Sequence, residues 1–501
     1  MLFNSYQFLF AFLPVTAVVY FLLGRYEARR AAAGWLVLCS LFFYAYWNPA
    51  YLLLLGGSVV GNYLVGRALG PGNAVRLRRQ LVLSLGVLGN LALLGYYKYA
   101  NFFVDSAGSL LGTSLTLETI ILPLAISFFT FQQIAYLADQ FREAGEPCSF
   151  LEYCLFVTFF PQLIAGPIVH HRSVRPQFAD PATYRPQAEN LAVGMTIFLI
   201  GLFKKVVLAD QAALFANHVF DGTAIAGTPT LAEAWLGTLA YTFQLYFDFS
   251  GYSDMAIGLG RLFGIRLPVN FNSPYKATSI VEFWRRWHIT LSVFLRDYLY
   301  VPLGGNRRGK VRRYGNLMLT MLLGGLWHGA GWNYVVWGGL HGAYLCVNHA
   351  WSALCRQMGW IRGKDALGWK LAGGCLTFLA VIVGWVFFRS ADFNSAGTVL
   401  QSMVGVHGWD VATGFNRSEA LGTLAALGLI IWGMPNTMQL MAAYRPVHDW
   451  DRVRDELAPV PTLLKWMLWR PSRARAVLML GCALLTLMNM TRVQEFLYFQ
   501  F

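Results

Sequence analysis

Charged side chains are scarce in this sequence. Only 13% of its 501 residues are charged, whereas 56% are hydrophobic and 16% are aromatic. A soluble protein of this length could not hide so much apolar surface from water. The scarcity of charge therefore excludes an ordinary soluble enzyme and predicts an all-α, polytopic membrane protein.

Motifs built on cysteine are missing as well. The seven cysteines are scattered, no CxxC pair occurs and no Cys/His spacing suits zinc, so no metal site is predicted. No GxSxG elbow, HExxH helix or Walker loop occurs in a context that would support its chemistry. There is no repeat or low-complexity tract, and the polar loops are too short for a separate catalytic domain. We therefore expect one integral membrane domain over residues 1–501.

Basic residues outnumber acidic ones, at 39 against 25, which gives a net charge of +14. In a soluble domain this excess would suggest nucleic acid, but basic loops also fix membrane topology, and no nucleic-acid partner is predicted. The clusters at 25–30, 67–79 and 307–313 each adjoin an apolar run, so we expect all three in the cytoplasm and the N-terminus outside. The N-terminus lacks a basic n-region and a cleavage site, which indicates an uncleaved first span.

Apolar runs of about 20 residues predict roughly eleven to thirteen membrane segments. Two of them, at about 314–328 and 332–350, are separated by Gly329, Gly331 and Asn333 directly after Trp327-His328. Non-helical backbone at membrane depth is tolerated where it is buried in protein or lines a cavity. An ionisable residue there is costly and is a functional hypothesis by default. The interruption therefore indicates a site around His328.

Residues 281–300 follow a helical pattern. Arg285, His288, Ser292 and Arg296 fall on one polar stripe, beside an aromatic stripe suited to the membrane interface. One interpretation is a surface-lying helix that fixes orientation. The other is a cytoplasmic binding face on which Arg and His meet an anionic donor. The pattern does not choose between them.

A second group of polar residues interrupts the apolar run at 231–263. Asp248, Tyr252 and Asp254 lie in its middle, and carboxylates at that depth need partners or a water-filled cavity. The two carboxylates are six residues apart and would face opposite sides of a regular helix, which disfavours an acid/base dyad. We expect them to be hydrogen-bonding struts. The candidate partners are Lys276, Arg285 and Arg286.

Histidine is thus the main candidate for chemistry, without a serine or cysteine nucleophile beside it. A histidine that deprotonates a hydroxyl, with Asn333 or the amides of the helix break steadying an oxyanion, fits acyl transfer. It fits ion transport less well, because transport tends to leave more carboxylates in the spans. His341, in GLHG, is expected to be structural.

Several passages together carry a family resemblance. They are SFFTFQQIAYLAD (127–139), FFPQLIAGPIV (159–169), YFDFSGYSDMAIGLG (246–260), FNSPYKATSIVEFWRRWHITLSVFLRDYLYVPLGGNR (271–307), GGLWHGAGWNYVVWGGLHG (324–342) and the C-terminal FLYFQF. In this order they resemble the membrane-bound O-acyltransferase (MBOAT) family. The branch is that of the alginate O-acetylation proteins, which also includes the teichoic-acid D-alanyl transfer protein.

The resemblance implies a fold and a division of roles. The fold would be a ring of tilted helices around a thinned centre, with an outer funnel and a cytoplasmic tunnel that meet near His328. His328 matches the family's catalytic histidine and His288 its second functional histidine. Family members move an acyl group from a cytoplasmic thioester toward an acceptor on the far side, and in the alginate branch periplasmic acetyltransferases complete the transfer.

These observations predict a multi-pass O-acetyltransferase (an O-acyltransferase) of the bacterial inner membrane that serves an exported polysaccharide, with alginate as the first candidate. The donor would be acetyl-CoA or an acyl carrier protein, with no bound cofactor. The alternatives are cellulose, peptidoglycan or a teichoic acid as acceptor, a transporter of acyl groups or lipid-linked sugars, and a scaffold for periplasmic enzymes. His328, as base or transient acyl acceptor, and His288 are the predicted catalytic residues. The predicted substrate-binding residues are Arg285, Arg296, Asn333, Asp248, Tyr252 and Trp327.

Overall fold

The computed structural model describes residues 1–501 except 71–75, 114–116, 144–147, 222–227, 361–366, 410–415, 491–495 and 498–501. The described residues form helices and connecting loops and contain no strand, which agrees with the predicted all-α class. Contacts divide the chain into two compact units. Unit 1 comprises Met1–Leu202, Tyr252–Val269 and Met441–Glu456, and unit 2 comprises Phe203–Gly251, Asn270–Leu440 and Leu457–Phe501.

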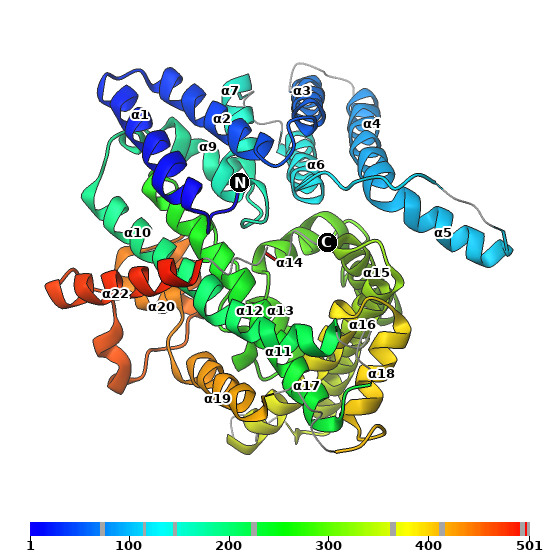
Figure 1. The fold of residues 1–501 in the computed structure, drawn as a ribbon. Helices are drawn as coiled ribbons and strands as arrows, with labels where there is room; N and C mark the ends of the chain where they lie inside the picture. The colour runs from blue at the N-terminus through cyan, green and yellow to red at the C-terminus, as the bar shows by residue number, and fades with distance from the viewer. Residues whose placement is uncertain are drawn as a thin grey trace. The chain divides into compact units, whose positions relative to one another are not determined.

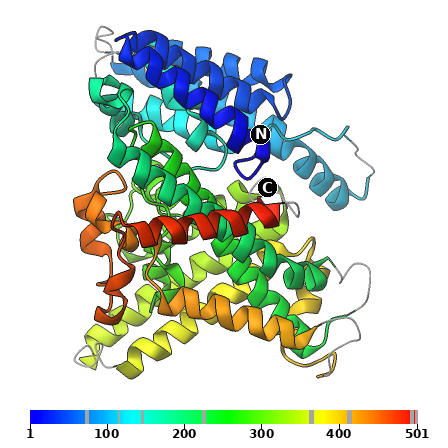
Figure 2. The ribbon, with the colours of Figure 1, turned by 60° about the vertical axis from the view of Figure 1, so that its left-hand side comes forward.

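Unit 1 is built mainly from the N-terminal helices. They are α1 (Leu13–Arg25), α2 (Arg29–Ala45), α3 (Tyr51–Ala68), α4 (Arg76–Leu94), α5 (Ala100–Leu111), α6 (Ile126–Glu143), α7 (Phe150–Thr158), α8 (Phe160–Leu163), α9 (His171–Ala179) and α10 (Ala188–Phe203), with α21 (Trp450–Glu456) near the other end of the chain. α1 and α2 lie side by side (Figures 1 and 2), and the indole N–H of Trp35 donates to the Thr16 carbonyl at 3.1 Å. The sharp return between α1 and α2 holds the first basic cluster.

Unit 2 contains the two stretches that carry the predicted histidines. Its helices are α11 (Asp210–Phe220), α13 (Ile280–Arg286), α14 (Ile289–Leu295), α15 (Lys310–His328), α16 (Trp332–Gln357), α17 (Leu367–Arg389), α18 (Phe393–Met403), α19 (Arg417–Gly428), α20 (Thr437–Leu440) and α22 (Arg473–Asn489). The long helix α12 (Leu231–Leu262) contributes to both units.

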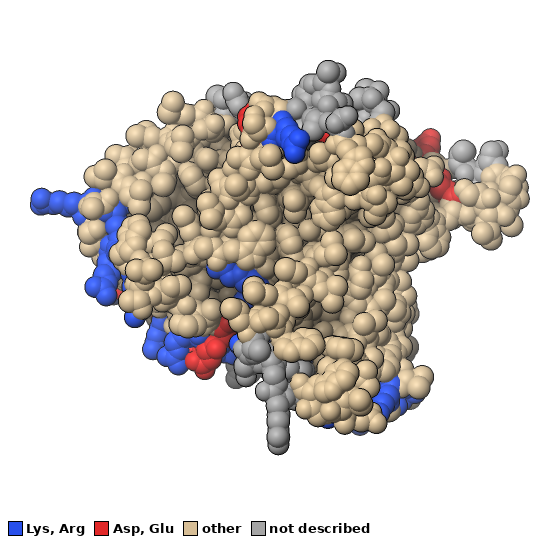
Figure 3. All heavy atoms as spheres, turned by 90° about the horizontal axis from the view of Figure 1, so that it is seen from below, with Lys and Arg blue, Asp and Glu red and all other residues tan. Residues whose placement is uncertain are grey.

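Four helical stretches of the described chain are long and apolar enough to cross a membrane. They are Phe8–Arg25, Arg76–Leu111, Ala188–Phe220 and Leu367–Arg389. On the face drawn in Figure 3, uncharged residues cover most of the described surface, and Lys and Arg gather toward its left margin. Both observations are typical of a multi-pass membrane protein. The higher count of eleven to thirteen segments stays a prediction.

Some predicted spans are interrupted. The run at 150–168 divides into α7 and α8, because Phe159 leaves the helical region and Pro161 lies in the first turn of α8. Pro161 has no N–H with which to continue the hydrogen-bond ladder of α7, whereas the first turn of a new helix tolerates it. The run at 118–138 becomes helical only at Ile126. Neither apolar run is one continuous helix.

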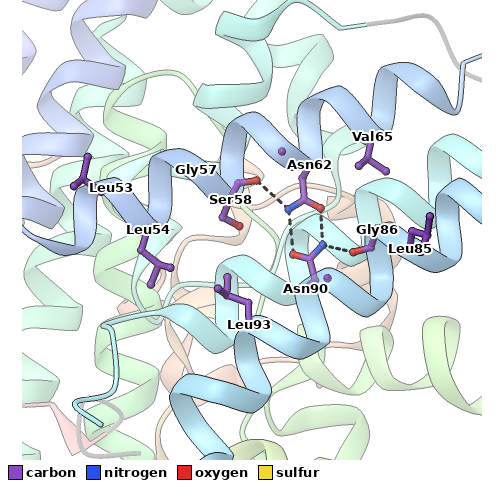
Figure 4. Close-up of a pocket in the computed structure, with 12 residues that line it drawn as sticks. Leu53, Leu54, Gly57, Ser58, Asn62, Val65, Leu85, Gly86, Asn90 and Leu93 are labelled. Carbon is purple, nitrogen blue, oxygen red and sulfur yellow. Dashed lines mark hydrogen bonds between the residues drawn. The ribbon is translucent and has the colours of Figure 1, made fainter.

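Polar groups inside the helical packing satisfy one another. A groove of about 430 Å³ lies between α3 and α4, and Asn62 and Asn90 are among the residues that line it. Figure 4 shows the two amides facing each other, with N···O distances of 3.1 and 2.6 Å, and each also donates to a carbonyl of its own helix. Because an unpaired amide is costly in an apolar surrounding, this reciprocal pair holds α3 against α4.

Candidate active site

The α15–α16 hairpin places His328. α15 ends at His328, Gly329 and Gly331 are extended, and α16 begins at Trp332. A side chain at Gly329 would collide with the Tyr334 ring, and one at Gly338 would collide with the Met321 carbonyl. The glycines thus let the two helices approach backbone to backbone. The predicted break after His328 is confirmed.

Aromatic rings surround His328, which is only 4% exposed. Its ring centroid lies 4.9 Å from that of Trp327, 5.0 Å from Trp337 and 5.3 Å from Phe388, each at a steep angle. Trp337 comes from α16 and Phe388 from α17. The surroundings of His328 are therefore mostly aromatic and apolar, and a reacting group beside its ring would be shielded from water.

His288 lies at a second helix break. α13 ends at Arg286, and His288 adopts the left-handed conformation, with φ of 42°, before α14 begins. A non-glycine residue in this region costs on the order of 1–3 kcal/mol and persists only where the surroundings hold it. His288 is 0% exposed and its ring meets the Phe249 ring at a centroid distance of 4.8 Å. The turn aims the imidazole into the protein interior.

Asn270 fixes the orientation of that imidazole. Its Oδ1 accepts hydrogen bonds from the Thr290 backbone N–H at 3.3 Å and the Thr290 hydroxyl at 3.0 Å, and lies 3.1 Å from His288 Nδ1. An amide oxygen only accepts, so Nδ1 must carry the proton that it donates. The neutral ring then keeps its lone pair on Nε2. The tautomer follows from the hydrogen-bond network.

The two histidines belong to one site. Their ring centroids are 6.4 Å apart, and the Trp327 ring lies 6.3 Å from His288 while also packing on His328. Trp327, predicted to bind substrate, thus forms a wall shared by both histidines. A substrate small enough to enter between the rings could contact both.

The predicted interfacial helix over 281–300 is wrong. The break at Trp287-His288 turns His288 inward, whereas Arg285 and Arg296 are exposed. Arg296 forms a short ion pair with its neighbour Asp297, with 2.6 Å between Nε and Oδ1. The stripe that joined Arg285, His288 and Arg296 therefore does not exist. Donor binding by Arg285 and Arg296 stays a prediction.

Asn333 and Asp248 hold structure together. Asn333 Nδ2 donates to the Ser390 carbonyl at 2.8 Å and so ties the start of α16 to the end of α17. Asp248 Oδ1 lies 2.6 Å from Lys205 Nζ, so its partner is Lys205, not the expected Lys276, Arg285 or Arg286. Those three side chains have other surroundings: Lys276 donates to the Met434 carbonyl, Arg286 pairs with Glu282 and Arg285 is exposed.

Tyr252 lies in unit 1, where it is 2% exposed and its ring stacks on Phe3 at a centroid distance of 5.0 Å. His341 accepts a hydrogen bond at Nδ1 from the Trp284 indole, 3.3 Å away, which agrees with its predicted structural role. The substrate-binding roles predicted for Asn333, Asp248 and Tyr252 stay predictions.

Buried polar atoms near the two histidines are left unsatisfied by the described residues. Asn270 Nδ2, Trp337 Nε1 and His341 Nε2 are buried and have no hydrogen-bond partner in the described part of the chain. A buried donor without an acceptor costs about 1–3 kcal/mol, so several together point to an occupant such as water or substrate. In the same part of the chain, no cluster of three or more His, Cys, Asp or Glu residues could hold a metal ion.

Asn270 and Lys205 were missed at the sequence level. Asn270 lies in an extended segment and its role depends on contact with a residue 18 positions away. Lys205 did carry a signal, because a lysine inside the apolar run of GLFKKVVLAD implies a buried partner.

Comparison with known proteins agrees with this geometry. The sequence profile of the MBOAT, membrane-bound O-acyltransferase family matches residues 80–381, more than half of the chain and including both histidines. The chain belongs to the MBOAT family. It is therefore a multi-pass membrane O-acyltransferase.

Individual relatives cover most of the chain. It is 48% identical to the peptidoglycan O-acetyltransferase of Helicobacter pylori, over 81% of this chain and 80% of the relative. It is 39% identical to the probable alginate O-acetylase AlgI of Pseudomonas putida over the full length of both. The teichoic acid D-alanyltransferase of Streptococcus thermophilus is more distant, at 28% identity over 53% of this chain and 68% of the relative. Membership of the family and an O-acetyltransferase activity are thus confirmed.

Proposed function

We propose that this membrane O-acetyltransferase transfers acetyl groups from a cytoplasmic thioester toward an exported polysaccharide, with His328 and His288 as its catalytic pair. The observation that carries the proposal is the meeting of two buried imidazoles, 6.4 Å apart, at two separate helix breaks. The two helix breaks bring these rings together among aromatic side chains.

The two rings suit different tasks. His328 acts as general base and removes the proton of the acceptor hydroxyl as its oxygen attacks the thioester carbonyl carbon. The new C–O bond forms, the C–S bond breaks, and the protonated His328 returns its proton to the departing thiolate. His288, whose Nε2 keeps its lone pair, accepts a hydrogen bond from an amide N–H of the donor's pantetheine arm. Coenzyme A and acyl carrier proteins both carry that arm.

Two acceptors deserve a direct comparison. Alginate follows from the family resemblance and from a full-length relative named as a probable alginate O-acetylase. Peptidoglycan is the second candidate, because a relative at 48% identity is named a peptidoglycan O-acetyltransferase. In both cases the protein would act in the bacterial inner membrane and hand the acetyl group to periplasmic acetyltransferase partners.

The proposal is tested by acetyl transfer in inverted inner-membrane vesicles that contain the full-length protein and one candidate periplasmic partner. Radiolabelled acetyl-CoA or acetylated acyl carrier protein is supplied outside, and label covalently attached to alginate or peptidoglycan fragments inside is counted. Label on one polymer, dependent on the protein, supports acyl transfer and identifies the acceptor. A transporter would instead deliver label that is not covalently bound, and a scaffold would retain full transfer when His328 is replaced.

Asn270 provides a narrower prediction. Asn270→Leu removes the oxygen that holds His288 Nδ1–H, so we expect the KM for the thioester donor to rise by about 10- to 100-fold, by analogy with the loss of a partner that orients a metal-binding histidine. kcat should change little. Steady-state kinetics with varied donor concentration measures both.

Asn270→Asp is the matched control, because a carboxylate still accepts from Nδ1 and from Thr290. It should restore most of the donor KM. If the Leu and Asp variants are equally impaired, or if Asn270→Leu lowers kcat alone, Asn270 does not orient a donor-binding His288.

A further inference from the structure

Unit 1 contains a polar pocket that the proposed reaction does not use. Its volume is about 350 Å³ and its lining includes Gln177 from α9, Asn190 from α10 and Arg261 from the last turn of α12. The cation of Arg266 and the imidazole of His448 also line it. Such a set of converging polar groups in a concave site is typical of small-ligand pockets.

Arg261 is the decisive residue. It is only 2% exposed, and one of its terminal nitrogens donates to Glu189 at 3.0 Å. Glu189 itself is 58% exposed, so water weakens the pair. Arg261 Nε has no hydrogen-bond partner among the described residues. A buried guanidinium with an open donor is costly, and an anion in the pocket would satisfy it.

The surrounding backbone is held firmly. Gln177 accepts from the Arg266 N–H at 2.8 Å and donates to the Arg266 carbonyl at 3.1 Å, which fixes that residue from both sides. The backbone N–H of His448 donates to the Leu267 carbonyl at 3.0 Å. The charges of Arg261 and Arg266 are close enough to repel each other. The Gln177 bonds hold the backbone of Arg266, and both guanidiniums line the same pocket, so one doubly charged anion there would contact two cations.

Acidic residues do not cancel this charge. Asp180 is the carboxylate that lines the pocket, and its Oδ1 accepts the Ala182 N–H at 2.8 Å, where it caps a short 3₁₀ helix. Asp449 lies beside His448, with 3.1 Å between Oδ1 and Nε2, and is 58% exposed. The lining therefore keeps an excess of cationic groups.

The pocket lies near the α1–α2 turn, which contains the first basic cluster. Its neighbour Tyr184 packs against Gly24 at the end of α1, and Arg185 lies 3.5 Å from Glu27 in the α1–α2 turn. The positive-inside rule assigns that turn, with Arg25 and Arg29, to the cytoplasm. A ligand would therefore reach the pocket from the cytoplasm or from the inner leaflet.

We propose that this pocket binds a phosphate group, held by Arg261 and Arg266 with His448 at its edge. The volume leaves room for the group to which the phosphate is attached. Two sources share this chemistry: the head group of an anionic phospholipid, and a soluble phosphate compound such as coenzyme A. The binding does not depend on the acyl-transfer reaction.

The test is ligand binding to the delipidated, detergent-purified full-length protein, followed by native mass spectrometry and by thermal unfolding. The probes are inorganic phosphate, coenzyme A and phosphatidylglycerol, each added alone. We expect one saturable site for at least one probe, and binding at least tenfold weaker in Arg266→Gln and Arg261→Gln. Saturation by phosphatidylglycerol alone identifies a lipid site, whereas saturation by phosphate or coenzyme A identifies a soluble ligand.

The matched control is Arg185→Gln, which removes an exposed arginine of the same face that does not line the pocket. It should bind each probe within about twofold of the unchanged protein, because an exposed ion pair contributes little. Arg266 is half-buried, so its variant remains informative if Arg261→Gln fails to fold. Absence of saturable binding for all three probes, or equal weakening in the Arg185 and Arg266 variants, would overturn the proposal.

Discussion

His328→Gln is expected to lower the rate of acetyl transfer by about 10²–10⁴-fold, the range that a general base usually supplies. Glutamine resembles the imidazole in size and still forms hydrogen bonds, but it cannot take a proton at neutral pH. The variant should fold, because α15 ends at a glycine break that does not depend on the imidazole. Donor binding, measured by calorimetry on the purified protein, should stay within a few-fold of the unchanged protein.

His288→Gln should differ from His328→Gln in its effect on donor binding. If His288 Nε2 holds the donor, its loss raises the donor KM and weakens donor binding more than it lowers kcat. If the two rings act independently, the loss of transfer rate in the double variant should be about the product of the two single losses. If they act as a unit, the rate of the double variant should be close to that of His328→Gln alone. Loss of donor binding in His328→Gln with retention in His288→Gln would mean that the two roles are exchanged.

His349→Gln is the control for both substitutions. His349 lies on α16, in the same hairpin as His328, but it is half-buried and does not belong to the aromatic surroundings of His328. The same chemical change there should leave kcat and KM within about twofold of the unchanged protein, since substitutions away from such features usually have small effects. Transfer above about a tenth of the normal rate in His328→Gln would contradict the catalytic assignment.

The sequence predicted one half of this site better than the other. Gly329 and Gly331 lie just after His328, and glycines inside an apolar run are a local signal of a helix break. His288 gave the opposite signal. Residues 281–300 follow helical spacing on both sides of it, so periodicity alone predicts a continuous helix.

The break at His288 is a tertiary effect. The chain around it is held by the extended segment before α13: Ile289 N–H donates to the Asn270 carbonyl at 3.0 Å, and Asn272 N–H donates to the Arg286 carbonyl at 2.9 Å. These bonds take the place of helical ones between α13 and α14, and they join positions that no local pattern connects. The same limit explains why Asn270 was missed, because an asparagine in a loop acquires its role only from what the fold brings beside it.

Ionisable residues show a further limit. The sequence indicated that Asp248 needs a partner at membrane depth, and that inference is correct. Spacing could not identify the partner, because it gave Lys276, Arg285 and Arg286 no advantage over Lys205 beyond chance proximity in the chain. The lysine lies 43 positions earlier, inside another apolar run, and only the packing of that run against α12 joins the two.

Lys205 is the centre of a buried ion cluster. Its Nζ lies 2.6 Å from Asp248 Oδ1 and 2.8 Å from Asp210 Oδ1, and both Lys205 and Asp248 are 1% exposed. Two residues near the C-terminus also contact the cluster. Leu497 N–H donates to Asp248 Oδ2 at 3.1 Å, and the Phe496 ring lies 5.0 Å from Lys205 Nζ. One lysine thus pairs with two carboxylates, and the cluster contacts Phe496 and Leu497.

Lys205→Met should therefore lower the free energy of unfolding by about 3–5 kcal/mol, because it leaves two carboxylates buried without their cation. Methionine keeps the length and apolar character of the side chain, so the loss reports mainly the charge. Unfolding in mild detergent, followed by tryptophan fluorescence, measures the change. Limited proteolysis should also cleave the C-terminal segment faster, since Phe496 loses its cation and Asp248 is no longer held in place.

Lys204→Met is the matched control. Lys204 is the preceding residue, is half-buried, and donates to the Thr437 hydroxyl at 2.9 Å. Its loss removes this hydrogen bond to a neutral hydroxyl, so the cost should be near 1 kcal/mol. Asp248→Asn added to Lys205→Met should recover part of the stability, because it removes one of the two unpaired charges. Equal destabilisation by the Lys204 and Lys205 substitutions, or no recovery in the double variant, would show that the cluster's charges do not determine the stability of this unit.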